Sequence, residues 1–232
     1  MADLSFRIEG AEVERFAAAP FINFRVAIDC RDVGRSVRNV MLQCQIRIES
    51  SRRSYAADEK SRLRDLFGDP QHWSRTLQGL LWTHAGALVP AFERSCLALL
   101  PVPCSFDFNV AATKYFHGLA GGEVPLLLLF SGTVFYDDGQ GLQISQIAWD
   151  QEVRYHLPVA LWQQMMDHYY PDSAYLRLPR SMFDRLARYK RLHGLTGWEQ
   201  ALDRLLDAHE PVAAPETLAA PEQTDAPRRV NA

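Results

Sequence analysis

The stretch CSFDFNVAATKYFHGLAGGEVPLLLLFSGTVFY, residues 104–136, decides the fold of this chain. Apolar residues occupy every second position from 104 to 110, a period that is typical of a strand with one face in water. After a glycine pair, the run from 124 to 136 is almost continuously apolar, which is typical of a central strand covered on both faces. We therefore expect two strands of a β-rich core, with a compact turn at Lys114–Phe116 between them.

The N-terminal part shows the same two-residue period in three segments, 4–8, 22–30 and 40–48. Each segment has one apolar and one polar face, which indicates an antiparallel sheet rather than a parallel one. Asp32–Gly34 predicts a turn, and so we expect the second and third segments to form a hairpin.

Later strands are predicted less uniformly. Residues 86–92 are interpreted as a crossing segment and 95–100 as a strand. Asp137–Gly141 is a strong hairpin turn signal. The segment after it, 142–157, changes phase, which predicts a β-bulge near Ser145 and Gln146.

Helical periods appear in two places. Residues 57–81 predict short helices inserted between strands, where they would cap one end of the sheet. From Pro158 onward the spacing is helical again, with a helix at 179–192 and a capping box at Thr196–Glu199 that opens a last helix.

These patterns together predict an α+β protein, with a mainly antiparallel β-sandwich or curled sheet, short inserted helices and a C-terminal helical segment. We expect one domain over residues 1–209, β-rich at 3–157 and helical at 158–208. Residues 210–232 are rich in Pro, Ala, Glu and Thr without periodicity, and predict a disordered tail.

Composition excludes several classes of protein. The chain has 232 residues, a formal net charge of -3 and 47% apolar residues, whereas general nucleic-acid binders carry a basic excess. No basic-then-apolar N-terminal signal is visible. The longest apolar run is far below the roughly 20 residues that span a bilayer. We expect a cytoplasmic protein with no membrane span and no nucleic-acid partner.

Motifs for catalysis, metals and cofactors are missing from the sequence. The four cysteines have no paired spacing, and three of them (Cys30, Cys44 and Cys104) fall on the apolar phase of predicted strands, so we expect buried, reduced thiols. The seven histidines form no HxH or HxxxH pair. No phosphate-binding glycine loop and no nucleophile elbow occurs. We therefore predict no catalytic residues, no metal site and no cofactor.

Two helical stripes are candidates for binding a protein partner. The first joins methionines and aromatic residues, which suit adaptable interfaces, although core packing against the sheet explains it as well. The second is a basic stripe that could steer an acidic partner surface, or could be an ordinary solvated helix face. The first stripe is Trp162, Met165, Met166, Tyr169 and Tyr170; the second is Arg180, Arg185, Arg188, Lys190 and Arg191.

The polar sheet face is a further candidate surface, with ordinary solvated sheet as its alternative explanation. Its members are Arg7, Asn23, Arg25, Gln43, Gln45, Arg47, Asp107 and Asn109. Arg52 and Arg53, close to Tyr55 and Glu59, could receive an acidic group or be tied to a neighbouring carboxylate. Lys114 could lie over Tyr115 with its ammonium group in water.

Several unusual strings resemble an uncharacterised bacterial family that is often encoded near actinobacterial-type nickel–iron hydrogenases. They are RRSYAADEKSRLRDLFGDPQHWSRTL, LPVPCSFDFNVAATKYF, GEVPLLLLFSGTVFY, HLPVALWQQMMDHYYP and LRLPRSMFDRLARYKRLHGL, and together they cover most of residues 3–208. The resemblance implies an accessory role, with hydrogenase subunits as partners, but no activity or site residue.

Three functions stay open from the sequence. The first is a non-catalytic accessory or protein-binding module that helps a hydrogenase assemble or mature. The second is a β-sandwich that binds a small ligand or metal, or acts as an enzyme, with polar groups such as His117, Asp107 or Lys114 converging in a pocket. The third is a client-holding chaperone, because the opening strand–turn–strand with Ala19-Pro20 is similar to the start of SecB-like export chaperones.

Overall fold

The computed structural model describes residues 3–31, 36–107, 109–174 and 176–209. The turn predicted at Asp32–Gly34, the side chain of Phe108 and the tail predicted at 210–232 lie outside the described residues. The chain divides into two compact units, Met1–Tyr175 and Leu176–Ala232.

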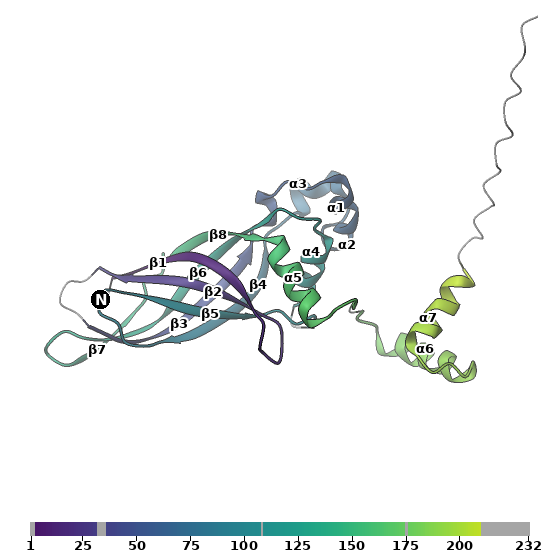
Figure 1. Ribbon diagram of the computed structural model, residues 1–232. Helices are drawn as coiled ribbons and strands as arrows, with labels where there is room; N and C mark the ends of the chain where they lie inside the picture. Colours follow the sequence, from purple (N-terminus) through teal and green to yellow (C-terminus); the bar gives the residue numbers. More distant parts are fainter. Residues whose placement is uncertain (1–2, 32–35, 108, 175, 210–232) are drawn as a thin grey trace, which may run out of the picture. The chain divides into compact units, whose positions relative to one another are not determined.

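The first unit is built on two antiparallel sheets (Figure 1). One sheet has the order β1-β2-β5, formed by Leu4–Glu14, Phe21–Cys30 and Ser95–Pro103. The other has the order β4-β3-β6-β7, with β8 also paired to β6. Its strands are β3 (Ser36–Ile48), β4 (Leu80–Val89), β6 (Glu123–Asp137), β7 (Leu142–Gln146) and β8 (Glu152–Pro158). The prediction of an α+β protein with a mainly antiparallel sheet is confirmed.

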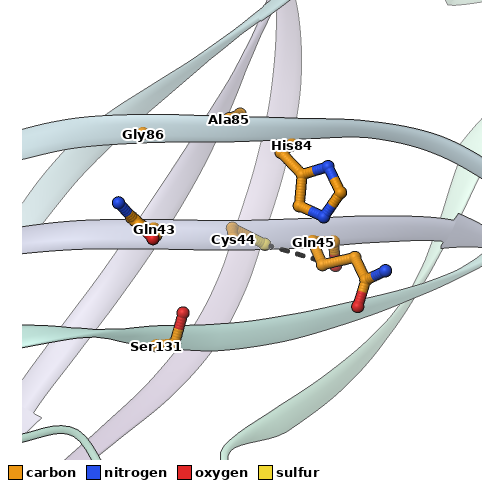
Figure 2. Close-up of a pocket in the computed structure, with 7 residues that line it drawn as sticks. All are labelled: Gln43, Cys44, Gln45, His84, Ala85, Gly86 and Ser131. Atoms are coloured by element: carbon orange, nitrogen blue, oxygen red, sulfur yellow. Dashed lines mark hydrogen bonds between the residues drawn. The ribbon is translucent and has the colours of Figure 1, made fainter.

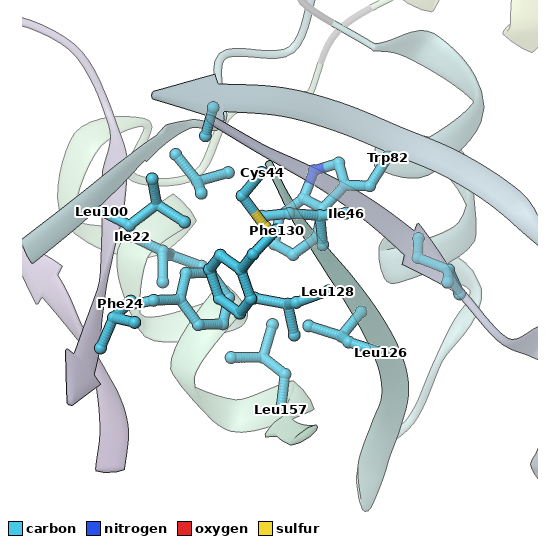
Figure 3. Close-up of a cluster of buried hydrophobic side chains, with 14 of the residues drawn as sticks. Ile22, Phe24, Cys44, Ile46, Trp82, Leu100, Leu126, Leu128, Phe130 and Leu157 are labelled. Carbon is cyan, nitrogen blue, oxygen red and sulfur yellow. The ribbon is translucent and has the colours of Figure 1, made fainter. Parts of the chain in front are cut away.

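The apolar faces of the two sheets pack on each other and form the core (Figure 3). Ile22, Phe24 and Leu100 come from the first sheet, and Ile46 and Leu128 come from the second; all are fully buried. The alternation of apolar and polar residues therefore places aliphatic and aromatic side chains between the sheets, where the burial of apolar surface stabilises the fold.

Short helices gather at one end of the two sheets (Figure 1). They are η1 (Ser50–Arg52), α1 (Ala57–Arg62), α2 (Arg64–Phe67), η2 (Pro70–His72), α3 (Trp73–Thr76), α4 (Val110–Gly118) and α5 (Val159–Tyr169). Tyr115 and Phe116 of α4 are fully buried, and the ring of Phe116 stacks on that of Trp162 in α5 with centroids 5.1 Å apart. The inserted helices predicted from 57 onward do cap this end, but β4 already begins at Leu80.

The strand predicted at 104–110 is wrong. Strand β5 ends at Pro103, and Asn109 caps helix α4 by accepting a hydrogen bond from the backbone N–H of Ala112 at 3.0 Å. An Asn at this position satisfies one of the free N–H groups of the first helical turn, and this local bond overrides the short alternation before it. The turn predicted at Lys114–Phe116 is wrong for the same reason, because these residues lie within α4.

The predicted hairpin between the second and third strands is also wrong. β2 pairs with β1 and β5, whereas β3 pairs with β4 and β6, so the chain passes from one sheet to the other between them. Both strands carry the same alternation, which identifies the apolar face but not the pairing partner. The crossing segment predicted at 86–92 likewise proves to lie partly in strand β4.

The phase change predicted in 142–157 is a complete break. β7 and β8 pair with different halves of β6. In the segment between β7 and β8, the backbone carbonyl of Gln151 accepts a hydrogen bond from the N–H of Phe130 in β6 at 2.8 Å. The long strand β6 therefore serves two partner strands along one edge.

The second unit contains α6 (Arg180–Leu192) and α7 (Trp198–Asp207). The predicted helix ends are close, but the capping box at Thr196–Glu199 is wrong. Gly197 is the N-cap residue, and Thr196 instead bonds through its N–H and hydroxyl to the side-chain Oε1 of Gln200, at 3.2 and 3.1 Å. The two helices meet through the rings of Phe183 and Trp198, whose centroids are 5.2 Å apart.

Candidate partner-binding surfaces

The methionine and aromatic stripe on α5 faces inward. Trp162, Met165 and Met166 are buried in the core, so core packing, the alternative left open by the sequence, accounts for them. Tyr169 is half-buried, and its hydroxyl donates to the carbonyl of Glu14 and accepts from the N–H of Ala17 at 3.3 Å. The stripe therefore fastens α5 to strand β1 and the loop that follows it.

Helices α6 and α7 expose an apolar face. Within this helix pair only Ala201 is fully buried. Besides Leu192 at the end of α6, which is 77% exposed, five large apolar side chains remain 40–59% exposed. We call these five the hairpin face: Met182, Phe183, Trp198, Leu202 and Leu206. The three residues on α7 are spaced at i, i+4 and i+8, so they lie along one side of that helix. The two residues on α6 are adjacent, and the two helices meet at Phe183 and Trp198.

A basic arc lies on α6 beside the hairpin face. Arg185, Arg188 and Arg191 follow at intervals of three residues and are exposed, and among the described residues no carboxylate lies within ion-pair distance of them. Two other cations of this helix are engaged locally. Arg180 pairs with Asp184 at 3.3 Å, and Lys190 donates to the carbonyl of Thr196 and lies 5.3 Å from the ring centroid of Trp198.

A second candidate surface is the outer face of the sheet that contains β3, β4 and β6. An open hollow of about 510 Å³ lies there. Figure 2 shows residues that line it, among them Gln43, Gln45, His84, Gly86 and Ser131. The register explains the hollow: Gly86 lies opposite Gln43 on the neighbouring strand, and Gly86 has no side chain to fill the space.

An adjoining apolar hollow of about 390 Å³ continues this surface. It is flanked by Met41 and Leu88, which are directly paired across β3 and β4 and are both exposed. The sequence identified Gln43 and Gln45 but missed His84, Gly86 and Ser131. Because residues 86–92 were predicted to be a crossing segment, Gly86 was not expected to lie in the sheet. Knowledge that β4 pairs with β3 would have placed it beside Gln43.

The predicted polar sheet face is divided between the two sheets. Arg7 and Arg25 lie on the first sheet and make ion pairs with Glu9, at 3.3 and 3.7 Å. On the same sheet Asn23 is buried, and its amide donates to the Glu14 carboxylate at 3.1 Å. Gln43, Gln45 and Arg47 lie on the second sheet, whereas Asp107 and Asn109 lie in no strand.

Arg53 and Glu59 form a buried ion pair at the helical end. Two hydrogen bonds of 3.2 and 2.9 Å join the guanidinium to the carboxylate, which also accepts from the backbone N–H groups of Ala56 and Ala120. Burial alone would raise the pKa of Glu59, but Arg53 and these N–H groups hold it below its ordinary value. The expectation of a solvated arginine tied to a carboxylate is therefore right about the carboxylate for Arg53 but wrong about the solvation, because the pair is buried. It fastens α1 to the loop before β6.

The three polar groups proposed for a ligand pocket do not converge on either hollow. Lys114 pairs with Asp65 at 3.7 Å. His117 lies against the rings of Phe106 and Trp162, with centroid distances of 5.7 and 4.9 Å, and partial burial lowers its pKa. Asp107 is exposed. None of the three lines either of the two hollows described above.

The four cysteines are free thiols, and Cys44 lies beneath the hollow shown in Figure 2. Burial raises the pKa of Cys44 and of Cys104 to about 12, so these thiols stay protonated and unreactive. Cys30 and Cys96 are half-buried. Among the described residues, no group of three or more His, Cys, Asp or Glu side chains is arranged to hold a metal ion.

The first unit is thus an α+β protein with two open antiparallel sheets and helices at one end. Residues 1–214 match the model of a family of unknown function, DUF6084, and this chain belongs to that family. No curated protein matches the sequence. Within the described residues, no helix has the length and apolar character needed to cross a membrane.

Proposed function

We propose that this protein is a non-catalytic accessory module that binds an acidic protein partner through helices α6 and α7. The exposed hairpin face is the single observation that carries this proposal. Apolar side chains in two adjacent helices normally bury against another surface, and a pair of helices of this size is too small to bury them by itself.

The charge beside the hairpin face specifies the chemistry of the partner. Residues 176–209 contain seven Lys or Arg and four Asp or Glu, a net charge of +3, in a chain whose total is -3. Arg185, Arg188 and Arg191 supply planar guanidinium groups that can each bind a carboxylate with two hydrogen bonds. The apolar side chains would supply the buried centre of the interface and the arginines its charged rim.

The partner that the sequence resemblance implies is a hydrogenase subunit. An accessory role in hydrogenase assembly or maturation fits a module whose surface offers apolar contact and positive charge. A further observation supports a binding module rather than a ligand pocket. His117 contacts Phe106 and Lys114 pairs with Asp65, so these two polar groups contact separate neighbours.

Affinity purification from the native cell tests the proposal. A tagged chain with Arg185→Glu, Arg188→Glu and Arg191→Glu is compared with the wild type and with a matched control, Arg7→Glu, Arg38→Glu and Arg64→Glu, in the first unit. We expect an acidic protein to co-purify with the wild type and the control, and to be lost from the α6 variant. Equal recovery with all three chains would contradict the proposal.

A further inference from the structure

The outer face of the second sheet carries a continuous uncharged surface. Its ten residues come from β3, β4, β6 and β7 and form rows across the sheet through the strand register. We call this the neutral face: Met41, Gln43, Gln45, His84, Gly86, Leu88, Ser131, Thr133, Phe135 and Ile144.

The neutral face is apolar at one end and polar at the other. Leu88 and Met41 are paired across β4 and β3 and are 72% and 56% exposed, and Ile144, paired with Phe135, is 62% exposed. Exposed apolar side chains grouped in this way commonly mark an interaction surface. The polar end contains the hollow over Gly86 shown in Figure 2.

Charge separates this face from the rest of the first unit. Residues 1–175 contain 16 Lys or Arg and 20 Asp or Glu, and none of these 36 belongs to the neutral face. Charged side chains lie only at its margins. Arg38 is paired with Asp137 at 2.9 Å, Arg47 follows Gln45 on the same face of β3, and Glu152 of β8 lies beyond Leu129 in the row of Gln45. A charged partner would find no group of opposite charge among these ten residues, whereas a second copy of this net-negative chain would bring no like charge onto them.

The polar groups of the neutral face can also pair with themselves. The side-chain amides of Gln43 and Gln45 each contain a donor and an acceptor, as do the imidazole of His84 and the hydroxyl of Ser131. Two copies related by a two-fold axis present the same groups to each other, so such groups can satisfy one another across the axis. Sheet faces pack in this way about 10 Å apart.

We propose that the neutral face is the interface of a homodimer, in which the outer face of the second sheet packs on the same face of a second copy. This inference does not depend on the partner proposed for α6 and α7, because it uses different residues and a different chemistry.

Molar mass measured by light scattering across a concentration series tests the dimer. The wild type is compared with two variants, one that places positive charge and one that places negative charge on the neutral face. One variant carries Gln43→Lys and Gln45→Lys, and the other carries Gln43→Glu and Gln45→Glu. We expect the wild type to be a dimer, and each variant alone to dissociate with a constant raised more than about tenfold by like-charge repulsion. An equimolar mixture of the two variants should regain the dimer mass, which also shows that both are folded.

The matched control is Leu97→Asp, which places a charge at an exposed leucine of β5 in the other sheet. This variant should remain a dimer. A wild type that is monomeric at every concentration would overturn the proposal, and would leave a different protein as the occupant of this face. A Lys variant that dimerises as tightly as the wild type, or a mixture that stays monomeric, would also overturn it.

Discussion

The rings of Phe6 and Phe130 stack across the interior of the protein, with centroids 4.6 Å apart and planes inclined by 15°. Phe6 belongs to β1 and Phe130 to β6, so the contact joins the two sheets directly. Phe130 lies opposite Cys44 on the neighbouring strand, in the middle of the buried cluster shown in Figure 3.

Truncating this ring should therefore be costly. We expect Phe130→Ala to lower the free energy of unfolding by about 3–5 kcal/mol, because it removes apolar contacts and leaves a cavity between the sheets. Urea unfolding followed by circular dichroism measures the loss. The control is Leu97→Ala on the exposed side of β5, where we expect a change within about 0.5 kcal/mol. A loss well below 1 kcal/mol at Phe130 would contradict the packing of the sheets.

Alternation in the sequence was sufficient to predict which side chains of β3 fill the core. Val40, Leu42, Cys44, Ile46 and Ile48 were assigned to one face, and all five are buried. The pairing of strands was harder, because it depends on contacts between residues far apart in the chain, and a two-residue period carries no information about them. This is why β2 and β3 were placed together and are in different sheets.

Gly132 of β6 has a backbone φ of +139° and faces the carbonyl of Met41 on β3, at a distance that leaves no room for a Cβ atom. We expect Gly132→Ala to destabilise the protein by at least about 2 kcal/mol, since both the backbone and the neighbouring strand must move. Gly10→Ala is the control, because a Cβ there meets nothing within 4 Å. Equal melting temperatures for the two variants would show that the close approach of β3 and β6 is not required.

The buried pair of Arg53 and Glu59 should make the free energy of unfolding decrease at acid pH. The pKa of Glu59 is lowered in the folded protein, so its contribution is present above its ordinary value of 4.5 and is lost as the pH falls through the lower, folded value. Glu59→Gln should cost about 3–5 kcal/mol near neutral pH, because Arg53 is left buried without a counter-charge. The gap to the wild type should be narrower at an acid pH below that folded value than near neutral pH.

Urea midpoints for the wild type and Glu59→Gln at the two pH values measure this narrowing. Asp58→Asn is the matched control, since its ion pair with Arg62 is exposed and should contribute less than about 1 kcal/mol. A gap that stays constant from neutral to acid pH would mean that folding does not lower the pKa of Glu59.

The thiols should divide into two classes in the folded protein. Burial raises the pKa of Cys44 and Cys104 to about 12, so almost no thiolate is present near neutral pH. Cys30, which the sequence predicted to be buried, is half-buried like Cys96, and we expect these two to react first with an aromatic disulfide reagent. Labelling followed by peptide mass analysis identifies the sites. Fast modification of Cys104 without denaturant would contradict the assignment.

The candidate surfaces could be predicted from the sequence only in part. The basic residues of α6 were recognised, because charge is readable at each position and helical spacing places it on one side. The stripe at Trp162, Met165 and Met166 could not be assigned, because an apolar helix face is the same in sequence whether it meets the core or a partner. Burial in the structure decides that it meets the core.

Photocrosslinking from α7 tests the central claim, that α6 and α7 bind an acidic partner, most directly. A photoreactive phenylalanine derivative replaces Leu202 of the hairpin face in one chain and Leu97 of β5 in a matched control, both exposed. After irradiation in the native cell, we predict one crosslinked acidic protein from position 202 and none of it from position 97. The crosslink should disappear when Arg185, Arg188 and Arg191 are also changed to Glu. A partner captured equally from both positions, or one whose capture is indifferent to these three arginines, would contradict the account.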